Sequence, residues 1–341
     1  MLRAASIGLG WWSDELAHAV QGSSDRIRID SCYSRSAEKR QKFAAGFGTR
    51  SHDSYEAVLA DPAIDAVLLT TPHSLHGAHA RQAAAAGKHV FVEKPFTLTL
   101  ADAQATIAAC RAAGVVLAVG HNRRLAPATR KLKEMIEAGE LGTVLHAEAQ
   151  FSVPGALGYK EGFWRASRAE SPGGGMTGLG IHMVDAIAHL LGPVARVCAF
   201  SKRQAAPVDI DDTTVAIMEC ANGRTAYLGT IFATQPTRFL NVYGTRAAAH
   251  ATDDLRVLHL RGGNTPLAPV ALDPACPPLA DPFAIQRDLL RMELDAFADA
   301  VGGVAPYPIL PEEAAHNVAV MEAILASAAR GGAPQPVAEH G

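Results

Sequence analysis

The stretch Ala4-Ala-Ser-Ile7-Gly8-Leu-Gly10-Trp-Trp-Ser13 places a glycine-rich turn directly after a short apolar run. In a strand-to-helix turn of this kind, the first glycine makes the tight bend. The second lets the backbone approach a pyrophosphate held at the helix N-terminus. Ser13 stands at the third position of the fingerprint and is small enough for helix–strand contact. The turn therefore predicts a dinucleotide site formed by Gly8, Leu9 and Gly10, provided that it opens a strand–helix repeat.

Such a repeat runs through the first third of the chain. Strands are expected at 4–7, 27–33, 66–70, 89–93 and 115–120. Helices are expected at 75–87 and 100–113, the second with Thr99 as its N-cap. The alternation predicts an α/β domain over residues 1–122 with a doubly wound, parallel sheet. Its strands are continuously apolar, as strands covered on both faces should be.

The pattern changes after Asn122. Apolar and polar residues alternate between 145 and 152, and similar segments occur at 213–220, 225–234, 238–244 and 257–261. A period of two marks strands with one buried face. Residues 123–341 are therefore expected to form an α+β domain with a large, open, mainly antiparallel sheet. A helix is expected at 127–138, and an amphipathic helix at 311–329 is expected to pack back on the N-terminal domain.

Composition excludes several classes of protein. The formal net charge of the 341 residues is -3, so nucleic acid is not an expected partner. The five cysteines show no C-x-x-C spacing, which favours reduced thiols in a cytoplasm over disulfides or a zinc site. The start of the chain lacks the pattern of a signal peptide, and no apolar run approaches membrane-spanning length. A cytoplasmic protein that binds small molecules is expected.

A second stretch, Val-Phe-Val-Glu93-Lys94-Pro95, places a lysine at the C-terminal end of a buried strand. Ligands of open α/β sheets bind at that edge. A lysine can move the proton of a hydroxyl group when its pKa falls from about 10.4 towards neutrality. Burial and a nearby positive charge both lower it. The alternative, a surface lysine at a strand end, fits poorly between a buried run and a proline.

Cofactor choice depends on the end of the second strand. NAD enzymes usually have Asp or Glu there, whereas this chain has Ser34 and Arg35, and Asp30 lies too early in the strand. A hydroxyl beside a guanidinium suits a 2′-phosphate. The pattern favours NADP(H) over NAD(H). The alternative is that Arg35 is a solvated residue at the start of a helix and does not bind the phosphate. In the glycine turn, Trp11 and Trp12 either pack between the domains or line the nicotinamide pocket. Packing between the domains is favoured for Trp12, and the sequence does not distinguish the two roles for Trp11.

Several motifs together resemble the glucose-fructose oxidoreductase / inositol dehydrogenase / rhizopine-catabolism (Gfo/Idh/MocA) family. The motifs that carry the resemblance are Gly8-Leu-Gly10, Thr71-Pro72-His-Ser-Leu-His76, Ala86-Gly-Lys-His-Val-Phe-Val-Glu93-Lys94-Pro95, Gly120-His-Asn122-Arg-Arg and Gly174-Gly-Met-Thr-Gly-Leu-Gly180-Ile-His182-x-x-Asp185. The resemblance implies a Rossmann domain and an open-sheet domain whose exposed face forms homodimers or homotetramers. It also implies that Lys94 is the catalytic acid/base and that the Lys94–Pro95 bond is cis.

The same resemblance assigns further residues to the site. The residues implied to line the cofactor are Thr71, Pro72, His76, Glu93, Lys94 and Asn122. Trp164 and Arg165 match a pair that lies against the cofactor in the anhydrofructose reductase branch of the family.

One position departs from the family pattern. The family usually has Asp four residues before the histidine, on the same helical face, and this chain has Gly178 there. His182 is still expected to assist catalysis by hydrogen-bonding the reacting oxygen, or a carboxylate comes from Asp185. Arg123 is a candidate for an anionic group of the substrate.

The expected function is an NAD(P)-dependent dehydrogenase or reductase that acts on the CH–OH group of a sugar, cyclitol or related cyclic polyol. The alternatives are a dehydrogenase of a ring diol or carboxylated cyclic hydroxy compound, and a non-catalytic, nucleotide-sensing protein. No metal is expected, because His73, His76 and His79 do not converge at their spacing.

Overall fold

The structure, a computed structural model, describes residues 1–272 and 284–338; Cys276 and the last three residues lie outside these ranges. The chain forms two compact units. The first comprises Met1–Asn122 and Pro278–Ala315, and the second comprises Arg123–Pro277 and His316–Gly341. The chain thus leaves the first unit after Asn122 and returns to it at 278–315, a return that the expected division into 1–122 and 123–341 did not include.

The first unit is built on a six-stranded sheet in the order β3-β2-β1-β4-β5-β6. Its strands are β1 (Leu2–Ile7), β2 (Ile27–Tyr33), β3 (Arg50–Ser51), β4 (Ala66–Leu69), β5 (His89–Glu93) and β6 (Leu117–Gly120). All five neighbouring pairs are parallel. This order is that of the dinucleotide-binding Rossmann fold. The predicted doubly wound sheet is confirmed.

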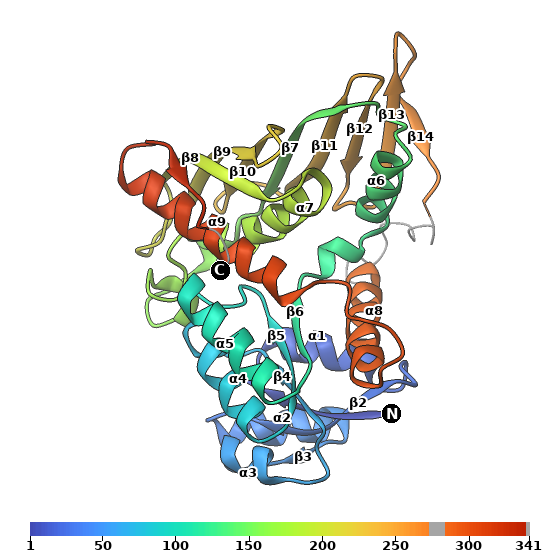
Figure 1. Cartoon of the computed structure of the whole chain (residues 1–341). Helices are drawn as coiled ribbons and strands as arrows, with labels where there is room; N and C mark the ends of the chain where they lie inside the picture. Colours follow the sequence, from blue (N-terminus) through green and yellow to red (C-terminus); the bar gives the residue numbers. More distant parts are fainter. Residues whose placement is uncertain (273–283, 339–341) are drawn as a thin grey trace. The chain divides into compact units, whose positions relative to one another are not determined.

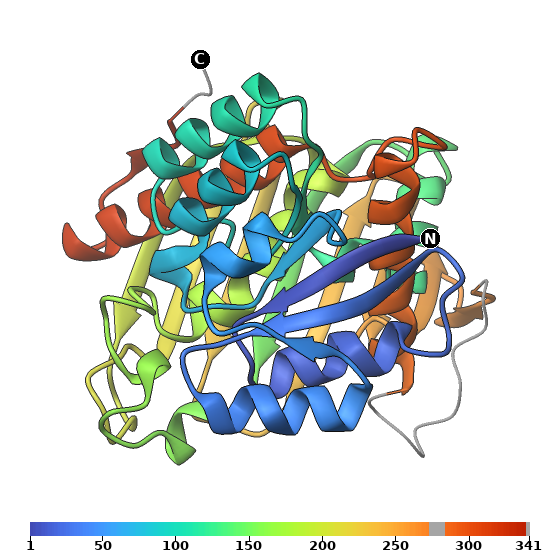
Figure 2. The same cartoon turned by 90° about the horizontal axis from the view of Figure 1, so that it is seen from below.

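Helices cover both faces of this sheet, as Figure 2 shows for α1 and α2 on one side and α4 and α5 on the other. The helices of the unit are α1 (Trp11–Val20), α2 (Ala37–Phe47), α3 (Tyr55–Ala60), α4 (His76–Ala85), α5 (Leu100–Ala112) and α8 (Ala284–Val301). Thr99 caps α5, because its side chain accepts a hydrogen bond from the Asp102 backbone N–H. Leu290, Leu294 and Phe297 of α8 are buried in the core that α1 and β2 share. Their burial explains why this late segment belongs to the first unit.

The second unit is built on a nine-stranded sheet in the order β14-β13-β12-β11-β7-β10-β9-β8-β15. Its strands are β7 (Val144–Ser152), β8 (Val194–Lys202), β9 (Thr213–Cys220), β10 (Thr225–Ile231), β11 (Thr237–Gly244), β12 (Ala247–Thr252), β13 (Val257–Gly262), β14 (Ala268–Val270) and β15 (Gln335–Pro336). Only the β10–β7 pair is parallel among the pairs of this sheet that the structure describes. The predicted open, mainly antiparallel sheet is confirmed.

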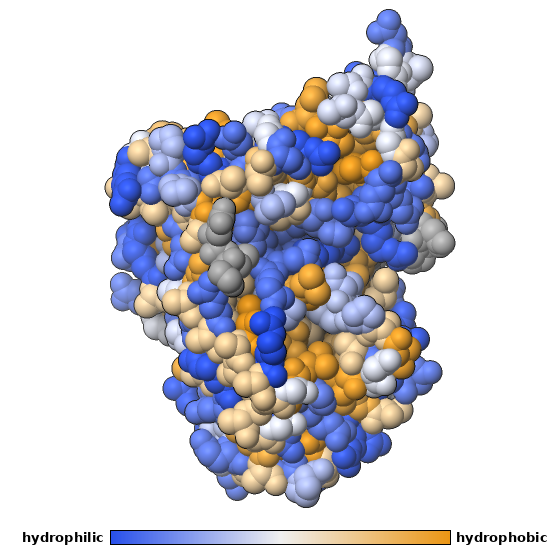
Figure 3. All heavy atoms as spheres, viewed as in Figure 1, coloured by the Kyte–Doolittle hydropathy of each residue, from blue (hydrophilic) through white to orange (hydrophobic). Residues whose placement is uncertain are grey.

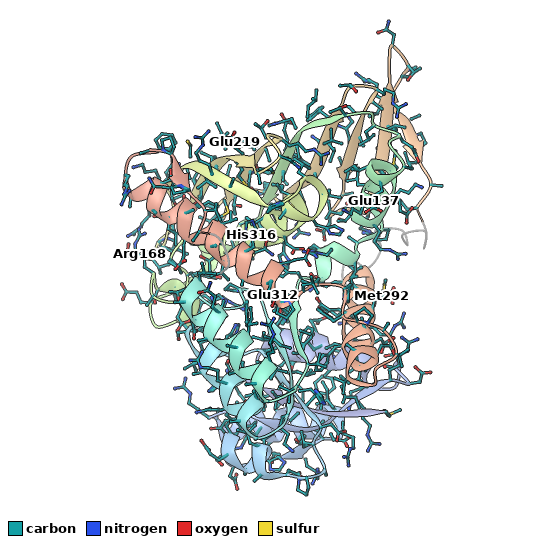
Figure 4. The ribbon with its side chains drawn as sticks, viewed as in Figure 1. Glu137, Arg168, Glu219, Met292, Glu312 and His316 are labelled. Atoms are coloured by element: carbon teal, nitrogen blue, oxygen red, sulfur yellow. The ribbon has the colours of Figure 1, made fainter. Side chains whose placement is uncertain are left out.

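Helices α6 (Pro127–Glu137), α7 (Ile181–Leu191) and α9 (Pro311–Ala329) complete the second unit, and Figure 1 shows them on one side of its sheet. The packing of 311–329 on the N-terminal domain stays a prediction. From His316 onward the helix belongs to the second unit. His316 Nε2 accepts a hydrogen bond from the Val194 backbone N–H (3.0 Å), and Ser327 Oγ accepts one from Ala199 N–H (2.8 Å). Figure 4 labels His316 on this helix.

The opposite face of the sheet carries no helix in the part of the chain that the structure describes. Residues in register form one row across it: Cys198, Ile217, Tyr227, Glu148, Asn241, His250 and His259. Ile217 is 62% exposed and Phe200 is 53% exposed.

Hydrophilic side chains are spread over the visible surface of both units, with smaller apolar patches between them (Figure 3). Among the described residues, no helix combines the length and apolar character that crossing a membrane requires.

Candidate active site

The glycine turn after β1 lies against the end of β4. Gly8 has φ +90°, and a Cβ on it would lie 2.8 Å from both the backbone N and Cγ2 of Thr71. Only glycine fits at such a position without strain. β1 and β4 are neighbours at the point where the strand order reverses, which is where ligands bind in open α/β sheets.

Gly10 and Ser13 close the turn and begin α1. The Ser13 hydroxyl accepts a hydrogen bond from the Gly10 N–H (2.9 Å) and donates one to the Gly10 carbonyl oxygen (2.7 Å). Ser13 is fully buried, so it supplies the close helix–strand contact predicted for this position. A Cβ on Gly10 would meet nothing within 4 Å. The backbone of the turn is therefore open to a phosphate group at the N-terminus of α1.

Two buried polar atoms in the first unit fit a bound dinucleotide. Thr71 is 7% exposed and Asn122 is 2% exposed. Neither Thr71 Oγ1 nor Asn122 Oδ1 has a hydrogen-bond partner among the described residues. Buried polar groups are nearly always hydrogen-bonded, so each of these atoms calls for a ligand. With the open turn at Gly10, they are candidates for hydrogen bonds to a bound dinucleotide.

His76 holds two loops of this region together. Its Nδ1 lies 2.9 Å from the Pro95 carbonyl oxygen, and its Nε2 lies 2.9 Å from the Thr71 carbonyl oxygen. The side chain is 1% exposed. Because both ring nitrogens face backbone carbonyls, His76 is placed to position the loops after β4 and β5. The predicted direct contact with the cofactor stays a hypothesis.

Lys94 follows β5 and is half-buried. Its Nζ lies 5.9 Å from the ring centroid of Trp12, in the first turn of α1, within the range of a cation–π contact. The carboxylate of Glu93 accepts a hydrogen bond from the Lys94 backbone N–H (3.2 Å). The Lys94–Pro95 bond is cis, as predicted. The ammonium group therefore lies beside the helix that the glycine turn begins.

The two tryptophans of the turn differ in burial. Trp12 packs against the core of the first unit, whereas Trp11 is 56% exposed. The packing of Trp12 between the domains stays a prediction. The two rings lie 5.3 Å apart and are tilted by 58°.

After β2, Arg40 holds the loop that carries Ser34 and Arg35. Its Nη1 donates to the Ser34 carbonyl (2.9 Å) and to the Arg35 carbonyl (3.4 Å), and its Nη2 pairs with Asp53 (2.9 Å). The Arg35 side chain is exposed. The loop is thus fixed through its backbone, which leaves the Arg35 side chain at the surface.

Gly8→Ala is expected to weaken the binding of NADPH by at least about tenfold, because a non-glycine residue at positive φ costs about 1–2 kcal/mol and the new Cβ would displace Thr71. Titration of the protein's fluorescence with NADPH measures the affinity. Gly46→Ala is the matched control, because Gly46 lies within α2 and a Cβ there meets nothing within 4 Å. Equal NADPH affinity in the two variants would contradict the assignment of the turn.

In the second unit, His182 lies in the first turn of α7 and is 5% exposed. Its ring stacks on Phe151 of β7 with centroids 6.0 Å apart. A π-helix, Met176–Gly180, leads directly into α7. Such segments occur frequently at functional sites. A Cβ on Gly178 would meet nothing within 4 Å, so open space lies where relatives of the resembled family have a carboxylate.

Asp185 is fully buried, and both of its carboxylate oxygens are engaged. Oδ2 accepts from Arg124 Nε (3.1 Å), and Oδ1 accepts from Arg124 Nη2 (2.6 Å) and from Asn317 Nδ2 (2.9 Å). The sequence hypothesis made Asp185 a partner of substrate hydroxyls. This bidentate pair instead indicates a positioning role, in which Asp185 fixes α7 to α9 and to the segment before α6.

Two other arginines of the second unit, Arg165 and Arg168, contact residues other than Asp185. Arg165 lies over the Trp164 ring, with Cζ 4.4 Å from the centroid. Arg168 is 45% exposed and pairs with Asp209 (3.1 Å) and Asp211 (2.9 Å); Figure 4 labels it.

Arg123 belongs to a cluster that sequence reasoning did not assemble. Its Nη1 donates to Asp254 Oδ2 (2.9 Å), and Arg238 Nη1 lies 3.0 Å from the same oxygen. Both guanidinium groups lie over Phe151, with Cζ 5.8 Å and 4.9 Å from its centroid. Arg238 carries a signal that the sequence contains: it shares the inward face of β11 with Leu240 and Val242, an unusual place for a charge.

Asp254 reaches these arginines from a strained turn. Asp253, Asp254 and Leu255 have φ of 49°, 59° and 64°, in the left-handed region that costs non-glycine residues about 1–2 kcal/mol each. Burial lowers the pKa of the Arg238 guanidinium, and the charge of Asp254 opposes that shift. Strain of this kind is concentrated at functional sites.

Within the described ranges, no group of three or more His, Cys, Asp or Glu side chains has an arrangement that could hold a metal ion.

The fold and the first-unit site define a nicotinamide-dinucleotide-binding protein of the Rossmann class. Residues 2–121 match the family described as "Oxidoreductase family, NAD-binding Rossmann fold", and residues 129–250 match the "GFO/IDH/MocA C-terminal domain". The chain belongs to the GFO/IDH/MocA oxidoreductase family.

Individual relatives agree with this assignment. A D-xylose 1-dehydrogenase (NADP(+)) of Haloferax volcanii is 30% identical over 285 residues, which cover 83% of this chain and 84% of the relative. A 1,5-anhydro-D-fructose reductase of Ensifer adhaerens is 35% identical over 167 residues, 48% of this chain, and the match spans about half of the reductase (49%). The crystal structure of a putative NADPH-dependent oxidoreductase of Desulfitobacterium hafniense is similar over 98% of this chain and 97% of its own, with a TM-score of 0.88 and 32% identity.

Proposed function

We propose that this protein is an NAD(P)-dependent oxidoreductase that interconverts a hydroxyl and a carbonyl group on a sugar, cyclitol or related cyclic polyol. NADP(H) is the favoured cofactor, and NAD(H) is the alternative. The observation that carries the proposal is the placement of Lys94. Its ammonium lies at the carboxyl end of β5, beside Trp12 of the helix that the glycine turn begins. Alcohol oxidation requires a group beside the dinucleotide site that accepts the hydroxyl proton, and the neutral amine of a lysine can do so.

The bound nicotinamide supplies the two-electron acceptor or donor for the substrate carbon. Lys94 takes the proton from the hydroxyl group during oxidation and returns it during reduction. Glu93 is 5% exposed, and its hydrogen bond to the Lys94 backbone supports the conformation of this loop. Thr71, Pro72 and Asn122 are assigned to cofactor binding, and Trp164 and Arg165 are assigned to it by the resemblance alone.

His182 is assigned the second catalytic role, a hydrogen bond to the reacting oxygen. Phe151 stacks on its ring and the α7 backbone fixes its position. Asp185 acts through that helix by its bond to Arg124, without touching the substrate.

The substrate class draws support from the relatives, whose names describe a D-xylose 1-dehydrogenase and a 1,5-anhydro-D-fructose reductase. Both are enzymes of sugars.

A panel of aldoses, polyols and sugar acids with NADP+ and NAD+ tests the proposal. Formation of the reduced cofactor, measured by absorbance, is expected with at least one class of compound. Tight nucleotide binding without turnover of any compound would instead identify a nucleotide-sensing protein.

Cofactor preference is proposed from Ser34 and Arg35, since the exposed guanidinium suits a 2′-phosphate. Arg35→Ala is expected to weaken NADPH binding about tenfold or more, the loss of a charge-assisted hydrogen bond. NADH affinity should stay within about twofold. Fluorescence titration with each nucleotide measures the effect, and Arg28→Ala, at an exposed arginine paired with Asp30, is the control. An equal loss for both nucleotides would exclude phosphate recognition by Arg35.

The open sheet face of the second unit is proposed to form a homodimer or homotetramer, supported by the exposed Ile217 and Phe200 on it. A cytoplasmic setting is proposed from the free thiols of Cys32, Cys110, Cys198 and Cys220.

A further inference from the structure

We infer that Arg123 and Arg238 bind a carboxylate group of the substrate, so that the preferred substrate is a sugar acid or a similar carboxylated cyclic hydroxy compound. The inference rests on the proposed function, because it names the substrate class of the same site. Its structural basis is the Arg123–Arg238–Asp254 cluster and the aromatic ring that joins this cluster to His182.

Hydrogen bonding in the cluster is incomplete. Arg123 and Arg238 share a single oxygen, Asp254 Oδ2. The Nε atoms of both arginines are buried without a hydrogen-bond partner among the residues that the structure describes. The Arg123 side chain is only 8% exposed, so water does not readily replace the missing acceptor. A buried charged donor without an acceptor is costly, which makes an anionic ligand the expected partner.

Arg124 provides the internal comparison. It uses Nε and Nη2 together on the carboxylate of Asp185, the bidentate geometry that satisfies a guanidinium. Arg123 and Arg238 both bind the carboxylate of Asp254, and the Nε–H group of each is available to a second carboxylate. Asp254 shows that the pair accommodates a carboxylate, and the left-handed backbone at Asp253, Asp254 and Leu255 is what brings it there.

The cluster is linked to the proposed catalytic histidine through Phe151. The Arg238 Cζ lies 4.9 Å from the Phe151 centroid, and the His182 ring stacks on the same phenyl group at 6.0 Å. Gly178 leaves open space one turn before His182, where the family pattern has a carboxylate. A carboxylate there would repel an anionic substrate, whereas glycine and two arginines favour one. In this protein the negative charge would therefore be supplied by the ligand, whereas in the family pattern it belongs to the protein.

Glucuronate and glucose test the inference, because they differ only in the carboxylate at one carbon of the same ring. Calorimetric titration of the NADP+-loaded protein is expected to show glucuronate binding about 10- to 100-fold more tightly than glucose. Arg238→Gln should bring the ratio of the two affinities close to one. Arg196→Gln is the control, since Arg196 is exposed on the same unit and pairs with Glu219, and it should keep the preference.

The ratio of the two affinities is measured within one protein, so partial loss of folding in Arg238→Gln does not mimic the effect. Arg238→Lys keeps the charge but loses the planar fork, and it should retain part of the preference. Equal binding of glucuronate and glucose, or a preference that survives Arg238→Gln, would overturn the inference, as would tighter binding of glucose 6-phosphate than of glucuronate. An Arg238-dependent preference, together with no turnover of any compound in the panel, would leave the carboxylate site standing and reject the oxidoreductase function.

Discussion

Lys94→Ala is expected to lower kcat by about 10²- to 10⁴-fold, the usual contribution of a positioned acid/base. The removed amine is the group proposed to take the hydroxyl proton, so oxidation has no proton acceptor at the end of β5. The affinity for NADPH should stay within about threefold, because Gly8, Thr71 and Asn122 are untouched. Turnover assays with the best compound of the panel, together with nucleotide titration, measure the two quantities separately.

Lys42→Ala serves as the control for Lys94→Ala, because Lys42 is an exposed residue of α2 in the same unit. It should turn over as fast as the unmodified protein. Undiminished turnover in Lys94→Ala, or a loss explained entirely by weaker nucleotide binding, would remove Lys94 from the chemistry.

Asp185→Ala is expected to destabilise the protein by about 3–5 kcal/mol, the cost of leaving a buried charge without its partner. Arg124 would lose a bidentate carboxylate, and its side chain is only 4% exposed. Asn317 would lose its acceptor as well. Urea unfolding followed by circular dichroism measures the change in the free energy of unfolding.

Glu219→Ala is the matched control for Asp185→Ala. It breaks the exposed pair between Glu219, labelled in Figure 4, and Arg196, whose side chains are 43% and 58% exposed. Exposed pairs contribute about 0–1 kcal/mol, so this variant should unfold almost as the unmodified protein does. A loss in Asp185→Ala no larger than in the control would contradict a structural role and restore Asp185 as a candidate for substrate contact.

Local patterns predicted most of the fold. Apolar runs marked the central strands of the first sheet, and β2 and β5 lie at the predicted residues. Thr99 and Pro311 marked the starts of α5 and α9. These elements depend on short-range chemistry, such as capping and strand periodicity, that sequence displays directly.

Long-range packing set the limits of that prediction. The amphipathic pattern of 311–329 located a helix, but it did not predict the hydrogen bonds of His316 and Ser327 to β8 of the second unit. Helix α8 was missed altogether; its buried Leu290, Leu294 and Phe297 complete the core of the first unit from a distant part of the chain. Periodicity shows that a face is buried without showing what buries it.

The candidate site divides in the same way. Gly8, Gly10 and Lys94 were found because they lie in contiguous motifs at strand ends. The pairing of Asp185 with Arg124, 61 residues away, and of Arg123 with Asp254, 131 residues away, has no local signature. The sequence shows a charged residue, Arg238, at an inward position of β11. Its partner Asp254 lies in a left-handed turn, and no glycine in the sequence indicates that turn.

Transfer of deuterium tests the central claim most directly. The protein is incubated with NADP+ and with sugars, polyols and sugar acids that carry deuterium on the reacting carbinol carbon, and the cofactor is analysed by mass spectrometry. We expect the unmodified protein to form reduced cofactor that contains one deuterium, and Lys94→Ala to form almost none. Nucleotide that binds but stays oxidised and unlabelled with every compound would contradict the account.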